Sequence, residues 1–238
     1  MPTVPTQPGI QAMDKSQLRN RMVDAQIVRR GVCDPAVLAA MRQVPREIFV
    51  GAGFEKLAYD DCALPIAEGQ TISQPYIVAA MAEAASIGTE ARVLEIGAGS
   101  GYASAVLSRI AREVYAIERL ARLSETTIRR FSHLGYANIV LKTGDGSRGW
   151  PEYAPFDAIV ISAGGPAVPE PLKSQLKIGG ILVAPVGPAS KQRLKRMIRT
   201  GEESFAENDL GAVRFIELVL PAAARIDPLS CRQLRPRV

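Results

Sequence analysis

The sequence predicts an α/β fold with a doubly wound, mostly parallel sheet, preceded by a small helical region. From residue 90 onward, short apolar runs alternate with amphipathic segments, the pattern of consecutive βαβ units. The first apolar run breaks into "GAGSG" at residues 97–101, as a strand does when it turns tightly into a helix. The 238 residues, 47% hydrophobic and 22% charged, suffice for one domain with a buried core.

The region before residue 90 carries two sets of helix signals. Asp14 or Ser16 can cap a helix that runs to Arg30, where Gly31 ends it. Asp34 can cap a second helix, whose end is set by Pro45. We expect one domain built from the helical residues 14–89 and the α/β core of residues 90–220, flanked by a flexible tail (1–13) and a C-terminal tail (221–238).

The strands of the core are expected at residues 92–97, 113–118, 138–144, 156–162 and 179–186, with helices between them at 102–110, 120–134 and 169–176. Segments 191–200 and 212–220 are expected to add closing strands. In the first of these, apolar residues recur both at every second position and at a spacing of four, so periodicity alone allows a strand or a helix.

Composition narrows the possible partners. The net charge of +5 and the basic run "KQRLKRMIR" (191–199) allow an acidic partner, but no aromatic residue stands between these charges as a base-stacking platform requires. No apolar run is long enough to span a bilayer, and the start lacks the pattern of a signal peptide. We therefore expect a cytoplasmic protein that binds neither membrane nor nucleic acid.

Cysteine usage is consistent with that location. Cys33, Cys62 and Cys231 are odd in number, far apart and without a CxxC pair, which argues against a disulfide framework or a zinc site. Reduced thiols and no bound metal are therefore expected.

The glycine loop has the frame E-x-G-x-G-x-G, formed by Glu95, Gly97, Gly99 and Gly101. A dinucleotide fingerprint would place its third glycine at position 102, where this chain has tyrosine. A carboxylate two residues before the loop would repel a pyrophosphate but would suit a ligand with an ammonium and a sulfonium group. S-adenosyl-L-methionine is such a ligand, and it carries no phosphate.

Two further acids follow the next strands. Glu118 closes the second strand, where a carboxylate can accept hydrogen bonds from both hydroxyls of a ribose; it can equally cap the following helix. Asp145 lies between two glycines after the third strand, where it can accept from an adenine amino group or simply form a turn. Three acids at three successive strand ends are more specific than any one of them.

Several blocks together resemble the protein-L-isoaspartate O-methyltransferases, enzymes that methylate the α-carboxylate of isoaspartyl residues. These blocks are "VLEIGAGSGY", "VYAIER", "GDGSRGW", "APFDAIVISA" and "GGILVAPVG", in the family's order, preceded by "YDDCALPIAEGQTISQPYIVAAM" at residues 59–81. The resemblance covers about residues 17–200. It implies the fold of the class I S-adenosyl-L-methionine-dependent methyltransferases and makes residues 14–89 the substrate side.

The resemblance also implies the site residues. Ser73 would be the active-site serine. The cofactor would be held by Thr71, Ile72, Ser73, Glu95, Gly97, Ala98, Gly99, Gly101, Glu118, Arg119, Asp145 and Gly146, and the isoaspartyl residue would be flanked by Leu64, Pro65, Ile66, Val213, Arg214 and Phe215. Ala67 and Glu217 depart from the family pattern, and Glu217 would bring a carboxylate near the substrate.

The expected activity is repair methylation of isoaspartyl proteins and peptides by a monomer. A carboxylate acceptor is ionised at neutral pH and needs no general base, and we expect the single histidine, His133, to be a surface or packing residue. Ser73 would align the acceptor, although without the resemblance a helix cap would be favoured. The alternatives are a carboxyl methyltransferase for another peptide, a nucleic-acid methyltransferase, a donor-binding module without catalysis, and a nicotinamide oxidoreductase, which the glycine spacing disfavours.

Overall fold

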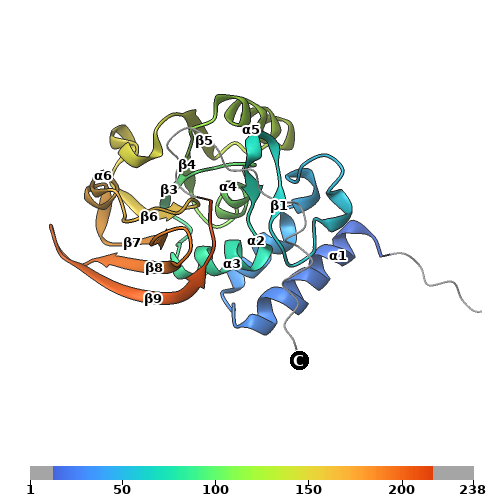
Figure 1. Ribbon diagram of the computed structural model, residues 1–238, viewed down its shortest axis with the longest axis horizontal. Helices are drawn as coiled ribbons and strands as arrows, with labels where there is room; N and C mark the ends of the chain where they lie inside the picture. The colour runs from blue at the N-terminus through green and yellow to red at the C-terminus, as the bar shows by residue number, and fades with distance from the viewer. Residues whose placement is uncertain (1–12, 217–238) are drawn as a thin grey trace, which may run out of the picture.

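Seven strands form one sheet in the order β5-β4-β3-β6-β7-β8-β9 in the computed structural model, which describes residues 13–216 (Figure 1). The strands are β3 (Arg92–Ile96), β4 (Glu113–Glu118), β5 (Ile139–Thr143), β6 (Phe156–Ile161), β7 (Leu176–Val186), β8 (Gln192–Arg199) and β9 (Phe205–Val213). Strands β3 to β7 are parallel, whereas β8 and β9 are added antiparallel. The chain reverses its direction across the sheet between β3 and β6, and at such a switch point the strand ends open into a crevice.

The helices are α1 (Lys15–Met22), α2 (Pro35–Gln43), α3 (Pro75–Ala84), α4 (Tyr102–Leu107), α5 (Ala121–Leu134) and α6 (Glu170–Ser174). A π-helical turn (Val23–Ile27) and a 3₁₀ turn (Val28–Arg30) continue α1, and further 3₁₀ turns lie at Arg46–Ile48, Glu55–Leu57, Ala67–Gly69, Gly146–Arg148 and Pro151–Tyr153. A short antiparallel hairpin, β1 (Leu64–Pro65) and β2 (Thr71–Ile72), precedes α3. The doubly wound fold predicted from the sequence is confirmed.

The N-terminal helices begin and end at the predicted signals. Asp14 forms a capping box with Gln17, and Gly31 ends the helical run with a φ of 95°. Asp34 caps α2 by accepting from the backbone N–H groups of the next turn. Glu83 of α3 accepts from the N–H groups of Cys33 and Asp34, both at 2.7 Å, so the start of α2 is fixed against α3.

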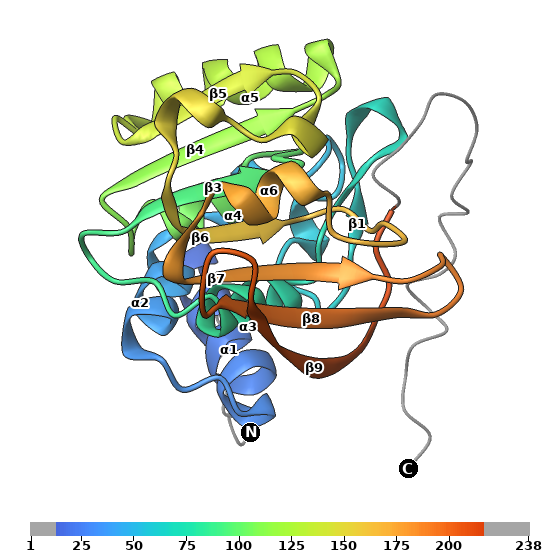
Figure 2. The same cartoon turned by 90° about the vertical axis from the view of Figure 1, so that its left-hand side faces the viewer.

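The two faces of the sheet bury different layers. Alternation along β3 places Val93 in the core cluster that includes α2, α3 and α4, and Leu94 in the cluster that includes α6. Figure 2 shows α6 on one side of the sheet and α2, α3 and α4 on the other. The two layers leave the carboxyl ends of β3 and β6 uncovered by a long helix.

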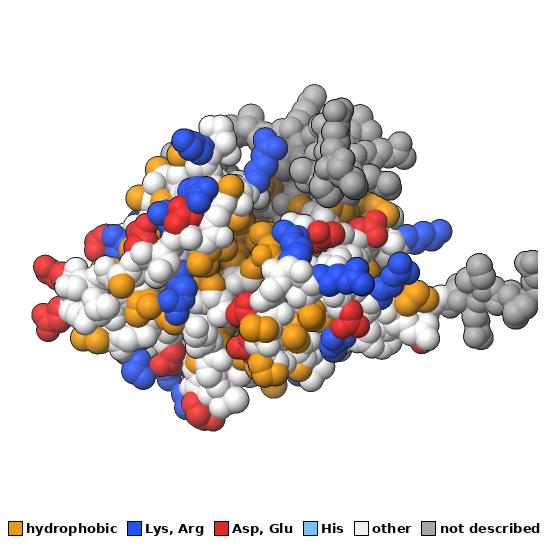
Figure 3. Space-filling view, turned by 90° about the horizontal axis from the view of Figure 1, so that it is seen from below, with side chains coloured by type: hydrophobic (Ala, Val, Ile, Leu, Met, Phe, Trp, Pro, Cys, Tyr) orange, Lys and Arg blue, Asp and Glu red, His pale blue; other side chains and the backbone are white. Residues whose placement is uncertain are grey.

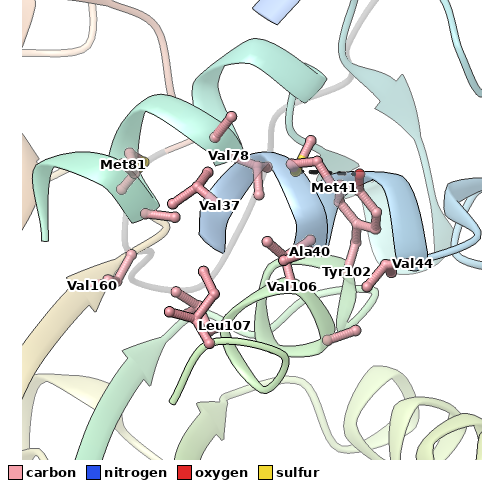
Figure 4. Packing of buried hydrophobic residues seen from close by; sticks show 14 of the residues in the cluster. Val37, Ala40, Met41, Val44, Val78, Met81, Tyr102, Val106, Leu107 and Val160 are labelled. Atoms are coloured by element: carbon pink, nitrogen blue, oxygen red, sulfur yellow. Dashed lines mark hydrogen bonds between the residues drawn. The ribbon is translucent and has the colours of Figure 1, made fainter. Parts of the chain in front are cut away.

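Helix α4 is anchored directly after the glycine loop. Its first residue, Tyr102, is 1% exposed and packs near Met41 of α2, Val44 directly after α2 and Val106 of its own helix (Figure 4). The phenol donates a hydrogen bond to the Met41 sulfur at 3.7 Å. Burial of a large aromatic side chain contributes about 2–3 kcal/mol, so Tyr102 fixes the exit of the loop.

The closing strands differ in part from the prediction. Segment 191–200 is indeed a strand, β8, but the last strand of the described residues is β9, which overlaps the predicted 212–220 only at its end. β9 escaped detection because "FAENDLGAV" buries none of its side chains fully; pairing with β8 stabilises it instead. Positions 217–220 lie outside the described residues.

The basic run on β8 is matched by acids on β9. Arg193 contacts Asp209 at 2.8 Å, and Lys195 contacts Glu207 at 2.7 Å. On the face drawn in Figure 3, lysine and arginine side chains are interspersed with aspartate and glutamate. Two of the basic residues of this segment are therefore neutralised by acids of the neighbouring strand.

Membrane-spanning helices and cysteines were both considered in the sequence. Among residues 13–216, no helix has both the length and the apolar character needed to cross a membrane. Cys33 is exposed and its thiol is free, Cys62 is half-buried, and Cys231 lies outside the described residues.

Gly101 tests the close packing of the loop. Its φ is +86°, and an added Cβ would lie 2.6 Å from the side chains of Phe131 and Thr127. Gly101→Ala is therefore expected to lower the free energy of unfolding by about 2–5 kcal/mol, from backbone strain and overpacking together. Gly135→Ala, at φ +71° with no described atom within 4 Å, should cost only about 1–2 kcal/mol. Denaturant titration measures both, and equal losses would contradict the packing argument.

Candidate active site

A cavity with about 530 Å³ of empty space, part of it open to solvent, lies at the carboxyl ends of β3 and β6. Three segments form it: the end of the β1–β2 hairpin with α3, the glycine loop with α4, and the end of β6. Its lining residues are Thr71, Ile72, Ser73, Val78, Met81, Ala82, Glu95, Gly97, Ala98, Gly99, Ser100, Tyr102, Ala103, Leu107, Val160 and Ser162. Seven of the predicted site residues, from Thr71 to Gly99, are therefore brought together here.

The glycine loop is held by its neighbours on both sides. The N–H of Gly99 donates to the Glu118 carboxylate at 2.8 Å, and the Thr127 hydroxyl of α5 donates to the Gly99 carbonyl at 2.8 Å. Arg130 of α5 donates to the Ser100 carbonyl at 2.7 Å. These contacts fix the wall of the cavity at the start of α4. The amino end of a helix favours a negatively charged ligand group.

Glu95 is the only charged side chain among the described residues that line the cavity. It is completely buried on β3, and it accepts hydrogen bonds from the hydroxyls of Ser104 and Ser162, the latter at 3.0 Å. Burial raises the pKa of Glu95 to about 7, although the two hydroxyls act in the opposite direction. A cationic ligand group in the cavity would supply the opposite charge that Glu95 lacks.

Ser73 stands on the other wall, between the hairpin and α3. The cap position of α3 is Gln74, which makes no side-chain capping bond, and the helix starts at Pro75. The interpretation of Ser73 as a helix cap is therefore wrong. Ser73 is half-buried, and within residues 13–216 its hydroxyl makes no hydrogen bond, so the hydroxyl can serve a ligand in the cavity.

The N-terminal helices hold this wall in place. Gln74 donates to the Asp61 carbonyl at 3.1 Å, and the Asp61 carboxylate pairs with Arg30 at 3.1 Å. The Arg30 guanidinium also lies 3.4 Å from the ring centroid of Tyr76, in the first turn of α3. The residues that follow Ser73 are thus tied to the helical run that begins with α1, a link that the sequence pattern did not reveal.

The two other strand-end acids lie outside the cavity lining. Glu118 is 6% exposed, and its two oxygens accept from the N–H groups of Gly99 and Leu120, at 2.8 and 2.9 Å. It therefore stabilises both the glycine loop and the start of α5, and each oxygen keeps a second lone pair for a ligand hydroxyl. Arg119 beside it is exposed.

Asp145 is exposed after β5 and accepts from the N–H and the hydroxyl of Ser147, at 3.0 and 2.8 Å. These two bonds hold the pKa of Asp145 below its usual value. In the structure, Asp145 therefore makes the contacts of a turn residue. Its contact with an adenine stays a prediction. A Cβ on neighbouring Gly146 would lie 2.4 Å from Ile96, so the turn packs tightly on the end of β3.

The predicted substrate residues fall into two groups. Leu64 is buried in the hairpin, whereas Pro65 and Ile66 line a second cavity of about 810 Å³. Other members of that lining are Phe49, Phe54, Ala67 and Arg130. Ile66 is also the nearest side chain to an added Cβ on Gly99, at 3.8 Å, so it lies between the hairpin and the glycine loop.

The second group follows β9. Val213 ends the strand, Arg214 is exposed, and the N–H of Phe215 donates to the Gln192 side chain at 2.6 Å. The carbonyl of Ile216 accepts from the N–H of Gly164, just beyond β6. This group therefore lies near the end of β6 but lines neither of the two cavities, and Glu217 lies outside the described residues.

The sequence analysis missed several lining residues. Val78, Met81 and Ala82 come from the inner face of α3, and they carried no signal beyond ordinary helix amphipathicity. Ser162 could have been found, because it directly follows a buried strand, the same position that singled out Glu118. Ser104 lies in α4 and shows its importance only through its contact with Glu95.

The cavity fits a ligand that carries a cationic amino-acid end. The lining combines a buried carboxylate, the backbone of the glycine loop and a serine hydroxyl with apolar side chains of α3, α4 and β6. A phosphate would be repelled by Glu95 once this side chain is ionised. The residues present therefore fit S-adenosyl-L-methionine better than a dinucleotide.

Comparison with known proteins gives consistent results. The family model for protein-L-isoaspartate(D-aspartate) O-methyltransferase (PCMT) matches residues 16–222. Protein-L-isoaspartate O-methyltransferase 2 of Pelobacter propionicus is 56% identical over 202 residues, which is 84% of this chain and 90% of that protein.

Solved structures agree with this result. One protein-L-isoaspartate O-methyltransferase has a TM-score of 0.77 at 30% identity and covers 87% of this chain, which in turn spans 66% of that longer chain. A PCMT from Plasmodium falciparum, solved in complex with S-adenosyl-L-homocysteine, has a TM-score of 0.72 at 22% identity, covers 84% of this chain and 98% of its own, and shows the shared fold. This chain, with its glycine loop, its buried Glu95 and its Ser73 hairpin around one cavity, belongs to the protein-L-isoaspartate(D-aspartate) O-methyltransferase family.

Proposed function

We propose that this chain transfers the methyl group of S-adenosyl-L-methionine to the α-carboxylate of L-isoaspartyl residues in damaged proteins and peptides, the first step of their repair. The observation that carries the proposal is one cavity that places the Ser73 hydroxyl, the glycine loop and the buried Glu95 together. Family membership and the names of the relatives support the same reaction.

The chain offers a partner for each part of the donor. Glu95 would receive the ammonium group, and the N–H groups of Ser100 and Ala103, which line the cavity, would face the carboxylate. The free lone pairs of Glu118 would accept from the ribose hydroxyls, and Asp145 with Gly146 would border the adenine. When bound, the donor supplies an electrophilic methyl group on a sulfonium.

The protein's contribution to methyl transfer is alignment. The acceptor carboxylate is already ionised at neutral pH, so no side chain has to remove a proton. Ser73 donates a hydrogen bond to that carboxylate and fixes its approach, and orientation of this kind can supply several kcal/mol. His133 is exposed on the last turn of α5, outside the cavity lining, which fits a mechanism without a histidine base.

The proposal extends to location and assembly. An exposed free thiol at Cys33 suits the reducing environment of the cytoplasm. Acids of β9 neutralise Arg193 and Lys195 of the basic run, which weakens the case for a nucleic-acid partner on this strand. We propose a monomer, for which sedimentation should give a single species of 25.6 kDa.

The reaction is tested with labelled donor and two peptides that differ only in one aspartyl or isoaspartyl linkage. Label should enter only the isoaspartyl peptide, as a base-labile methyl ester. Label in both peptides would indicate a carboxyl methyltransferase with another preference. Label in added RNA or DNA, or no transfer at all, would overturn the proposal.

Ser73→Ala tests the aligning hydroxyl. We expect turnover to fall about 10- to 100-fold, the equivalent of one hydrogen bond to a charged group, while donor affinity measured by calorimetry stays nearly unchanged. Ser132→Ala, at an exposed position of α5, serves as the matched control and should change neither. If Ser73→Ala weakens donor binding as much as turnover, Ser73 belongs to the donor site instead.

Asp145→Ala tests the adenine contact. Donor affinity is expected to fall about 10-fold or more because a charge-assisted hydrogen bond is lost. Ser147→Ala removes the hydroxyl bond within the turn and leaves the carboxylate, so it should retain most of the affinity. Calorimetry with donor distinguishes the two, and unchanged affinity in Asp145→Ala would refute the assignment.

A further inference from the structure

The Glu95 carboxylate is oriented by two hydroxyls from different elements. Ser104 in α4 donates to Oε2, and Ser162 after β6 donates to Oε1 at 3.0 Å. Ser104 is fully buried, and Ser162 itself lines the cavity. A serine hydroxyl has a single proton to donate, and in both residues this proton is donated to Glu95. The carboxylate is therefore held from both sides.

No opposite charge among the described residues accompanies this carboxylate. The charged group that acts on it is Glu118 at the end of β4, which has the same sign. From the other elements at the cavity, α3 contributes Val78, Met81 and Ala82, α4 contributes the Ser104 hydroxyl, and β6 contributes Val160 before Ser162. An ionised Glu95 without ligand is therefore a buried charge stabilised by two hydroxyls alone, which is costly.

We propose that Ser104 and Ser162 are positioning residues that orient Glu95 toward the cationic end of the methyl donor, and that Glu95 releases its proton to solvent when the donor binds. The inference rests on the proposed function, because it takes the donor to be S-adenosyl-L-methionine. The ammonium group replaces the proton as the positive partner of the carboxylate, so the charge inside the cavity stays balanced.

The protonation state of the free protein makes the release measurable. Burial raises the pKa of Glu95 to about 7, so at pH 6.5 about three quarters of the molecules carry the proton. Donor affinity should then rise about fivefold between pH 6 and pH 7 as the competing proton leaves. Measurements stay below pH 7.5, because an α-amino group itself loses its proton near pH 7.7–8.0.

Calorimetry of S-adenosyl-L-methionine binding at pH 6.5, in two buffers of different ionisation enthalpy, counts the protons. We expect release of about 0.7 proton by the wild type and none by Glu95→Gln. Ser162→Ala and Ser104→Ala remove bonds that lower the Glu95 pKa, so they should move the rise in affinity to higher pH. Ser132→Ala should behave like the wild type.

The outcomes separate the inference from the proposed function. Donor binding by the wild type without proton release, or serine variants that weaken binding equally at every pH, would overturn the inference and leave the function intact. No donor binding at all would overturn both. If a serine variant fails to fold, the wild type and Glu95→Gln still decide, because proton release is measured on each directly.

A second readout needs no donor. The folded pKa of Glu95 lies above the ordinary glutamate value of 4.5, so the native state binds more protons than the unfolded state between about pH 4.5 and 7. The stability of the wild type should therefore fall as pH rises through this window, relative to Glu95→Gln. Parallel stability curves for the two proteins, measured by denaturant titration, would contradict the burial of a titrating Glu95.

Discussion

The turn from β3 into α4 is the constraint on which the rest of the structure depends. Five residues must turn the chain from strand to helix, form part of the cavity wall and allow α5 to pack behind them. Gly101 meets the last requirement, because any Cβ there would collide with Phe131. Glu118 and Thr127 then secure the loop through its peptide groups, so the donor wall is rigid before any ligand arrives.

The cavity wall that carries Ser73 is stabilised by contacts with the N-terminal region. Ser73 is carried by a two-residue strand and the entry to α3, neither of which would be stable alone. Asp61, Arg30 and Gln74 supply the missing support through ion pairing and hydrogen bonds. The helical N-terminal region therefore supports the wall of the cavity that carries Ser73.

Much of this arrangement is encoded locally and could be predicted. Strand β4 coincides with the predicted residues 113–118, because a short continuous apolar run ended by an acid is typical of a buried parallel strand. Strand β9 could not be predicted from its own residues, because its stability comes from the partner strand β8. The same distinction holds in the site: Glu95 was predicted from the glycine-loop motif and Ser73 from the family resemblance, whereas the contact of Ser104 with Glu95 forms only when α4 packs against β3.

Electrostatics also connects the two walls. An anionic acceptor would be repelled by an ionised, unpaired Glu95, because the cavity has low dielectric walls in which Coulomb interactions are strong. If Glu95 keeps its proton until the donor's ammonium group replaces it, the pocket stays neutral without ligand and again when the donor is bound. The acceptor carboxylate then meets only the positive sulfonium and the Ser73 hydroxyl. With this exchange, the proposed site accommodates a cationic donor and an anionic acceptor without a basic residue in the described cavity lining.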